Sequence, residues 1–184
     1  MIYNFPSPFV YRQKVESHQK IKEYLYPLIL EDFSENKEKY IMKTWGCEVY
    51  ATIHHMIPFL TNEFFMKEVI WSNLQNCFDQ VRLSRQPTMN KLAQIWYNYY
   101  EPGMFQEAHT HVGSQFSGVY LLHLNEKNTT AFLNPSSEHY QYESYSPDDV
   151  EEGEVFIFPS GLLHYVNPVK ENRISISFNI HTEF

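Results

Sequence analysis

The sequence contains little cysteine and no long apolar run, and each of these shortages excludes a class of protein. Its 184 residues include two cysteines, Cys47 and Cys77, which lack metal-ligand spacing and are too few for a disulfide framework. No apolar stretch approaches the roughly 18 residues of a transmembrane helix, and the N-terminal segment lacks a basic region followed by an apolar one. We therefore expect a cytoplasmic protein that does not associate with membranes.

Basic residues are also scarce. Lys and Arg together number 14 against 22 Asp and Glu, which gives a formal net charge of −8. This balance disfavours nonspecific binding to nucleic acid, whose phosphates attract basic proteins. Hydrophobic residues, at 43%, and aromatic residues, at 17%, are abundant enough for a substantial core. A chain of this length buries about 70% of its unfolded surface, so we expect a single domain over residues 1–184.

The first half of the sequence, residues 1–90, is predicted to be a helix-rich flank that packs on the rest. Residues 15–33 carry apolar side chains at helical spacing, and Pro27 marks a kink or a boundary. Residues 45–53 alternate between apolar and polar side chains, which is compatible with a strand. Residues 62–84 form the clearest helix, and we interpret its apolar stripe as core packing: Met66, Ile70, Leu74, Cys77, Phe78 and Val81.

From residue 91 the apolar period changes to two, which predicts a β-rich core over residues 91–184. Gly, Pro or Asn residues lie at the ends of the predicted strands, which cover residues 92–100, 116–124, 129–133, 154–158 and 173–180. A helical flank followed by short strands is typical of a mainly β protein, a sandwich or jelly roll with helices packed on it. The polar segment 134–150 is predicted to be a mobile lid at the mouth of a pocket, or else a solvated excursion.

Three histidines are candidate metal ligands. His109 and His111 lie two positions apart, and at this spacing in a strand their imidazoles share a face with Cα atoms about 6.5 Å apart. Both rings can then reach one metal at about 2.0–2.1 Å, and His164, after a Pro-Ser-Gly turn, would complete an open site suited to Fe(II) and oxygen. Glu107 shares the same parity and is the alternative carboxylate ligand. A chance surface pair is the competing interpretation, and the flanking turns favour the metal site.

The last predicted strand has one polar face and one apolar face. Arg173 and Ser175 share the polar face. A planar, two-pronged guanidinium beside a hydroxyl suits a carboxylate ligand, although an exposed edge strand would show the same alternation. In the strand predicted at 92–100, Asn98 and Tyr100 also share a face, and they either point into a pocket or form ordinary polar tips of a sheet.

These residues resemble a known family. The sequence from Asn98 through Tyr100 and Gly103 to His109 is similar to the Asn-x-Tyr-x-Pro-Gly…His-x-Asp pattern of AlkB-type and prolyl-hydroxylase-like Fe(II)/2-oxoglutarate-dependent oxygenases. The whole chain looks like a smaller group of such oxygenases from bacteria and marine phages. The segments that carry this likeness are residues 5–8 (Phe-Pro-Ser-Pro), 109–120 and 153–179.

The resemblance implies a double-stranded β-helix, also called a jelly roll, that binds Fe(II). His109 and His164 would be iron ligands, and His111 stands where most of the superfamily has Asp. A neutral imidazole leaves the Fe(II) site one charge unit more positive than a carboxylate does. We therefore expect a shifted redox potential and a shifted oxygen reactivity, with metal binding retained.

The resemblance also implies a cosubstrate site. Arg173, helped by Ser175, would hold the distal carboxylate of 2-oxoglutarate, and Asn98 and Tyr100 would contact the same molecule. The implied protein is a dioxygenase, an oxidoreductase of a bacterium or a phage-infected cell that hydroxylates an unidentified substrate while 2-oxoglutarate becomes succinate. Its partners would be 2-oxoglutarate, O2 and that substrate, and a homodimer remains open.

Two rival classes fit part of the pattern. The spacing from Gly103 to His109 and His111, and from Gly153 to His164, also matches the two motifs of metal-binding cupins. Gln115 occupies the position where the first cupin motif has a Glu ligand, and a cupin needs no arginine for a cosubstrate. The other rival is a non-enzymatic binding jelly roll, which need hold no metal.

Overall fold

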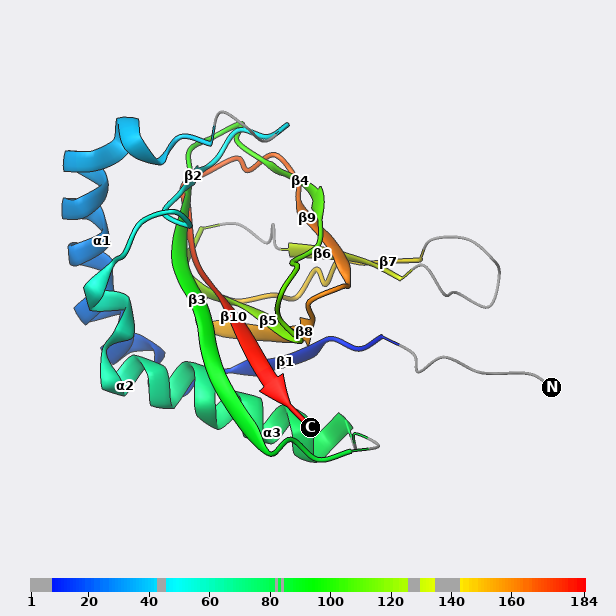
Figure 1. Ribbon diagram of the computed structural model, residues 1–184. Coiled ribbons are helices and arrows are strands. Elements are labelled where there is room, and N and C mark those ends of the chain that lie inside the picture. Colours follow the sequence, from blue (N-terminus) through cyan, green and yellow to red (C-terminus); the bar gives the residue numbers. More distant parts are fainter. Residues whose placement is uncertain (1–7, 43–45, 82, 84, 126–129, 135–142) are drawn as a thin grey trace.

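The computed structural model describes residues 8–42, 46–81, 83, 85–125, 130–134 and 143–184, and it consists of two antiparallel sheets with helices on one side (Figure 1). The larger sheet has the order β1-β8-β5-β10-β3-β2, with bounds β1 (Tyr11–Lys14), β2 (Tyr50–Ala51), β3 (Met89–Tyr100), β5 (Phe116–Leu124), β8 (Glu154–Pro159) and β10 (Arg173–Glu183). The smaller sheet has the order β4-β9-β6-β7, with bounds β4 (Gln106–His109), β6 (Thr130–Asn134), β7 (Glu143–Tyr145) and β9 (Leu163–Val166).

The predicted mainly β architecture with a helical flank is confirmed. Each of the five strands predicted from residue 92 onward is present, although β3 begins at Met89 and β10 continues to Glu183. The strand expected over residues 45–53 is reduced to β2, which has two residues and pairs with Tyr99 and Asn98 of β3. The period-two pattern does not predict β1, β7 or β9, because strands of three or four residues contain too few alternations to be recognised.

Helix α1 (His18–Tyr40) is longer than the helix predicted at residues 15–33. Its buried stripe continues past Phe33 to Tyr40, so packing carries the helix through a segment of charged residues. Pro27 lies inside the helix on its exposed side, where the helix tolerates it as a local disturbance. No helix among the described residues is long and apolar enough to span a bilayer.

The second helical region begins after a short 3-10 turn (Pro58–Thr61) and has three parts: α2 (Glu63–Phe65), a π-helical segment (Met66–Trp71) and α3 (Ser72–Val81). Asn62 caps its start, because its Oδ1 accepts hydrogen bonds from the backbone N–H groups of Phe64 and Phe65. The Asn73 amide donates to the carbonyls of Glu68 and Val69 and so satisfies two acceptors of the wide π-helical turn. The predicted helix at 62–84 is thus present, with a π-helical segment that the sequence does not reveal.

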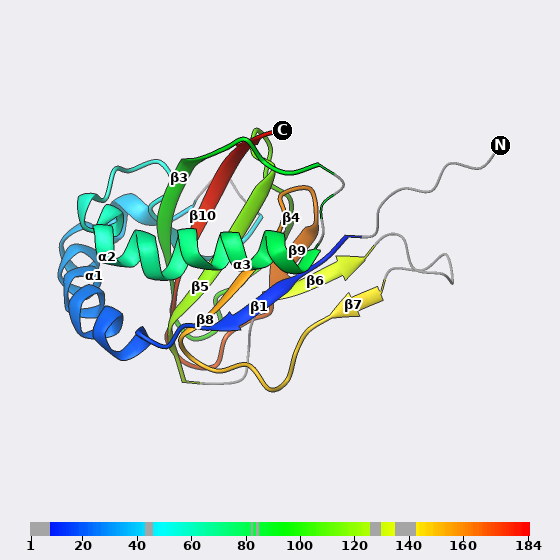
Figure 2. The same cartoon turned by 90° about the horizontal axis from the view of Figure 1, so that it is seen from below.

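The helices cover the outer face of the larger sheet, and α3 crosses that face in Figure 2. Strand β10 divides its side chains between the two sides of the sheet. Ile174, Ile176 and Phe178 belong to the core that also contains the buried stripes of α1 and α3. The alternate residues of β10, which begin with Arg173, line a cavity on the opposite face. The fold therefore places its largest apolar cluster on the outer face of the larger sheet, and on the inner face a cavity lined by the polar residues of β10.

Gly118 in β5 marks the tightest contact between that sheet and the core. A Cβ atom at Gly118 would lie 2.2 Å from Cζ of Phe178, whose ring is fully buried. We expect Gly118→Ala to lower the free energy of unfolding by about 1–3 kcal/mol, because the ring cannot move without displacing its neighbours. Gly161→Ala is the matched control, since no atom lies within 4 Å of the added Cβ. Urea denaturation of both variants measures their free energies of unfolding. Equal values would show that the Phe178 ring can move aside without loss of stability.

A network of charged side chains joins α1 to the larger sheet. Oε1 of Glu152 accepts from Nζ of Lys22 (2.6 Å) and lies 3.1 Å from Nε2 of His18, while Oε2 accepts from the backbone N–H of Leu124 (2.9 Å). His123 Nδ1 lies 3.1 Å from the same Oε2. Burial alone would raise the pKa of Glu152, but the hydrogen bonds from Lys22, Leu124 and His18 outweigh it and lower the pKa to about 2.

This carboxylate should make folding stability depend on pH. Its pKa is lower in the folded protein than the ordinary 4.5, so its contribution is complete above pH 4.5 and is lost as the pH falls toward 2. We expect Glu152→Gln to be destabilised most above pH 4.5, with a gap from the unmutated protein that narrows toward pH 2. Thermal unfolding across this range measures the gap. Glu151→Gln, which removes an exposed partner of Lys14, is the control and should show little effect. A gap that does not change with pH would contradict the assignment.

Candidate metal centre

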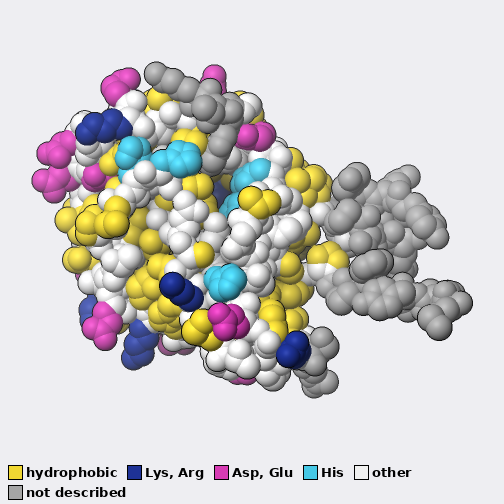
Figure 3. All heavy atoms as spheres, in the orientation of Figure 1, with side chains coloured by type: hydrophobic (Ala, Val, Ile, Leu, Met, Phe, Trp, Pro, Cys, Tyr) yellow, Lys and Arg dark blue, Asp and Glu magenta, His cyan; other side chains and the backbone are white. Residues whose placement is uncertain are grey.

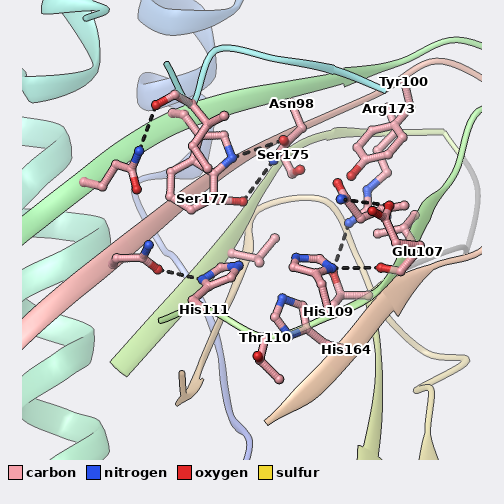
Figure 4. A pocket seen from close by; sticks show the side chains of 18 of the residues that line it. Asn98, Tyr100, Glu107, His109, Thr110, His111, His164, Arg173, Ser175 and Ser177 are labelled. Atoms are coloured by element: carbon pink, nitrogen blue, oxygen red, sulfur yellow. Dashed lines mark hydrogen bonds between the residues drawn. The ribbon is translucent and has the colours of Figure 1, made fainter. Parts of the chain in front are cut away.

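A cavity of about 300 Å³ lies between the two sheets. The larger sheet contributes residues of β3 and β10 to its wall, and the smaller sheet contributes residues of β4, β6 and β9. Its residues include every position that the sequence suggests for metal or cosubstrate binding: Asn98, Tyr100, Glu107, His109, His111, His164, Arg173 and Ser175. Polar side chains that are far apart in the sequence therefore line one cavity (Figure 4).

Three histidines meet at one side of this cavity. His109 ends β4 and lies directly opposite His164 of β9 in the register of the smaller sheet. His111 lies two residues beyond the end of β4, and its backbone N–H donates to the carbonyl of Ser160 (2.9 Å), which fixes the chain there. One ring nitrogen from each histidine lies within 4.8 Å of the corresponding atoms of the other two. Figure 4 shows the three rings turned toward a common space.

The Nδ1 atoms of all three rings have oxygen partners. Nδ1 of His109 lies 2.8 Å from the Glu107 carbonyl, and Nδ1 of His164 lies 2.8 Å from the Leu162 carbonyl. A carbonyl can only accept, so both Nδ1 atoms carry the proton and donate it. His111 Nδ1 lies 2.7 Å from an amide oxygen, which again can only accept. Each Nε2 is therefore the unprotonated ring nitrogen, the form in which a histidine binds a metal.

Burial keeps the three imidazoles neutral. It lowers the pKa of His109, and it lowers the pKa of His111 to about 4. The pKa of His164 is also far below its ordinary value, chiefly through burial and then through the proximity of His109. Three neutral imidazoles at neutral pH need no deprotonation before they bind a cation.

This donor set fits a divalent transition metal. Two nitrogens that are each about 2.1 Å from one ion can lie at most about 4.2 Å apart. Ligand atoms within 4.8 Å of one another therefore need to approach by less than about 1 Å to meet this condition. Neutral imidazoles suit iron, zinc, copper and nickel, and three of them on one side leave coordination positions open toward the cavity.

Glu107 is not part of this group. Among the described residues, the side chains placed to hold a metal together are the three histidines, and Glu107 is not among them. Its Oε2 accepts from Nε2 of Gln106 (3.4 Å), while its backbone carbonyl is the acceptor for His109. Glu107 therefore supports a candidate ligand through its main chain, and its side chain lines another part of the cavity wall.

Arg173 and Tyr100 form the closed end of the cavity. They are opposite each other in the pairing of β10 with β3, and their side chains are 1% and 2% exposed. Nη2 of Arg173 donates to Oγ1 of Thr130 (3.1 Å), and the guanidinium carbon lies 5.2 Å from the centre of the Tyr100 ring. Burial raises the pKa of Tyr100 to about 12, so its hydroxyl stays protonated. The opposite end is open, since Val112 on the same wall is 92% exposed.

The remaining predicted residues lie between these two ends. Ser175 is buried and lines the cavity one step along β10 from Arg173 on the same face. Asn98 faces the same space and is held by two hydrogen bonds, because its amide donates to Ser177 Oγ (3.0 Å) and its oxygen accepts from Nε1 of Trp96 (3.1 Å). The arrangement therefore has a buried cation, hydroxyl groups and an amide leading toward the histidines.

The sequence did not reveal the residues that surround His111. Oδ1 of Asn179 and Oγ of Ser117 lie 2.7 and 2.8 Å from its Nδ1, and the Trp96 ring is 5.6 Å away between ring centres. Asn179 has the parity of Arg173 and Ser175, so its direction into the cavity could be predicted. Its partner could not, because His111 is 68 residues distant in the sequence.

The segment predicted as a lid, residues 134–150, does not lie at the histidine cavity where the structure describes it. Residues 135–142 lie outside the described residues. The described part lines no portion of the histidine cavity, whereas Asn134 and Tyr145 line a second cavity, also of about 300 Å³, together with Phe9, Phe132 and Leu162. The described residues thus give no support to a lid here. On the face of the molecule shown in Figure 3, histidine side chains are spread from the upper left to the middle, and most charged side chains lie nearer the edge.

Comparisons with known proteins agree with this geometry. Residues 94–179 match the protein-family model described as "Putative 2OG-Fe(II) oxygenase". That range contains the three histidines, Arg173, Ser175, Asn98 and Tyr100. A search of curated proteins finds no match.

Solved structures with similar folds cover nearly all of the chain. A collagen prolyl hydroxylase of Paramecium bursaria chlorella virus 1 has a TM-score of 0.60 at 11% identity, over 100% of this chain and 96% of that one. A prolyl-4-hydroxylase of Pseudomonas putida has a TM-score of 0.54 at 16% identity, over 95% and 93%. The α-ketoglutarate-dependent epimerase SnoN of nogalamycin biosynthesis has a TM-score of 0.62 at 12% identity, over 95% and 78%. At these identities the likeness establishes the fold, which is the predicted double-stranded β-helix.

Proposed function

We propose that the chain is a 2OG-Fe(II) oxygenase, because residues 94–179 match the model of that family, and that it is a dioxygenase that hydroxylates a C–H bond. In this reaction the substrate C–H, O2 and 2-oxoglutarate become C–OH, CO2 and succinate. One oxygen atom of O2 enters the new hydroxyl group, and the other enters succinate. The observation that supports this best is the sharing of one cavity by three open imidazole nitrogens and a buried guanidinium.

The three histidines are proposed to hold Fe(II) through their Nε2 atoms. Bound Fe(II) would supply the activation of O2, which protein side chains cannot provide. His109 and His164 keep fixed orientations because their Nδ1–H groups donate to backbone carbonyls. His111 is the neutral third ligand where relatives have a carboxylate, so the protein part of the site adds no negative charge to the ion.

The closed end of the cavity is proposed to bind 2-oxoglutarate. Arg173 would receive the distal carboxylate as a two-pronged donor, and the Ser175 hydroxyl would add a further hydrogen bond. Tyr100 retains its proton and can donate to the same carboxylate, and Asn98 lines the same cavity. The cosubstrate would thereby exclude water from the buried guanidinium and leave the open end of the cavity to the substrate.

Anaerobic calorimetry tests this function. 2-Oxoglutarate is titrated into the Mn(II)-loaded protein, and we expect saturable binding that disappears when the metal is removed, because the cosubstrate would bind both the ion and Arg173. In air, the Fe(II)-loaded protein should then release succinate from 2-oxoglutarate. Metal binding without any 2-oxoglutarate binding would instead support the metal-binding cupin, and absence of both would support a non-enzymatic binding protein.

A further inference from the structure

We propose that Asn179 is a positioning residue that fixes the His111 ring in the tautomer whose Nε2 is free to bind metal. The inference rests on the proposed function only in taking the three histidines as metal ligands. It concerns the metal-free protein as well, because a tautomer is already set before any metal arrives.

Three polar atoms form a closed triangle behind the His111 ring. Nδ1 of His111 lies 2.7 Å from Oδ1 of Asn179 and 2.8 Å from Oγ of Ser117, and these two oxygens are 2.8 Å apart. In Figure 4 the dashed line at His111 runs from its ring away from the other two histidines. The ring therefore turns Nδ1 toward the larger sheet and Nε2 toward His109 and His164.

The amide oxygen determines which ring nitrogen carries the proton. An amide oxygen can only accept, whereas a serine hydroxyl can either donate or accept. With Oδ1 of Asn179 facing it, Nδ1 of His111 must be the donor, and Nε2 must keep its lone pair. Ser117 alone would permit either tautomer, because its hydroxyl can rotate. Asn179 is thus the residue that selects the metal-binding form.

The triangle is held rigidly by its surroundings. Asn179 is opposite Ser117 in the pairing of β10 with β5, and a register shift in the pairing of β10 with β3 follows directly after it. Ser117 Oγ also lies 2.8 Å from Oγ of Ser160, which is 2.9 Å from Oγ of Ser114. Ser117 and Ser160 are 0% and 1% exposed. A buried chain of this kind holds its members in one arrangement when every member has a partner.

His111 differs from the other two histidines in this respect. Nδ1 of His109 and Nδ1 of His164 face backbone carbonyls, which no substitution can remove. The Nδ1 partners of His111 are side chains, so a substitution at Asn179 can change the orientation and the metal binding of the His111 ring.

The direct test is the tautomeric state of the metal-free protein, measured by long-range 1H–15N NMR of the imidazoles. We expect all three rings to carry the proton on Nδ1 in the unmutated protein and in Asn179→Asp, which retains an acceptor. In Asn179→Leu, His111 should populate both tautomers. Asn73→Leu is the matched control, because Asn73 is similarly buried but bonds to Tyr11 and to carbonyls of its own helical region, away from the histidines. If the His111 proton lies on Nε2 in the unmutated protein, this measurement alone overturns the proposal, and no variant is needed.

Metal affinity provides the second readout, measured by Co(II) competition against a chelator. We expect Asn179→Leu to bind Co(II) about 10–100-fold more weakly, the usual cost of removing a hydrogen-bond partner of a metal-binding histidine. Asn179→Asp should bind at least as tightly as the unmutated protein, and Asn73→Leu should match it. Equal affinity of Asn179→Leu and the unmutated protein overturns the proposal. If the unmutated protein binds no metal, the proposed function fails, and the NMR measurement still decides the role of Asn179.

Discussion

Replacing Arg173 by Met is expected to weaken binding of 2-oxoglutarate to the Mn(II)-loaded protein by at least tenfold. The guanidinium is almost completely buried at the closed end of the cavity, so a carboxylate that binds there loses its main electrostatic partner. Removing one member of a buried charged pair costs on the order of 2–5 kcal/mol. Methionine has a similar length and no charge, so the change isolates the charge from the packing over Tyr100.

Anaerobic calorimetry with 2-oxoglutarate measures this loss, and the affinity for Mn(II) itself should hardly change. Arg12→Met is the matched control, because Arg12 forms its ion pairs with Glu154 and Asp149 and does not line the cavity. Arg173→Lys tests geometry as well as charge, since an ammonium group cannot form the two-pronged contact. Equal affinities of the unmutated protein and Arg173→Met would remove Arg173 from the cosubstrate site.

The second large effect is expected at the histidines. His109→Ala should lower the affinity for Fe(II) or Co(II) by at least about 100-fold, because loss of an outer hydrogen-bond partner alone costs up to about that much and here a ligand itself is removed. His109 is one of the three grouped histidines, and it lies at the end of β4, opposite His164. Binding of 2-oxoglutarate should fall with the metal.

Metal content after dialysis and Co(II) competition both measure the effect. His55→Ala is the control, since His55 is exposed and lies outside the cavity wall. His111→Asp is the informative companion, because it exchanges a neutral imidazole for a carboxylate, which can also bind a metal, and so should keep the metal while adding one negative charge to the site. Retention of full metal affinity in His109→Ala would show that the three histidines do not form the metal site.

The two long strands at the site, β3 and β10, could be predicted because each is long enough to show its alternation. Strands β4 and β9, which carry His109 and His164, have only four residues each and are too short to show it. In the last strand, the parity of Arg173 and Ser175 gives the face of Ser177 and Asn179, and the structure has all four on the cavity wall. The closeness of His109 and His111 follows from the same rule, even though His111 lies beyond the end of β4. Local periodicity therefore predicts which residues share a face.

Other features depend on contacts that no local pattern contains. The helix predicted to kink or end at Pro27 continues to Tyr40, because its stripe packs on the sheet and because Pro27 lies on the exposed side. The π-helical segment requires Asn73 to reach back to two carbonyls, and a helical period of apolar residues looks the same with or without it. The pairing of His111 with Asn179 requires knowledge of how β10 lies beside β5. Tertiary packing decides each of these cases.

Strand β10 has a consequence for how this sequence can change. Its alternate positions serve two different purposes: Ile174, Ile176 and Phe178 belong to the core under the helices, and the residues between them line the cavity. Register shifts lie between Ile174 and Ser175 against β5, and between Asn179 and Ile180 against β3. Inserting one residue within this stretch would exchange the two faces, placing a guanidinium in the core and an apolar side chain beside the histidines. Substitutions can adjust the two faces independently, whereas a change in length would impair folding and chemistry together.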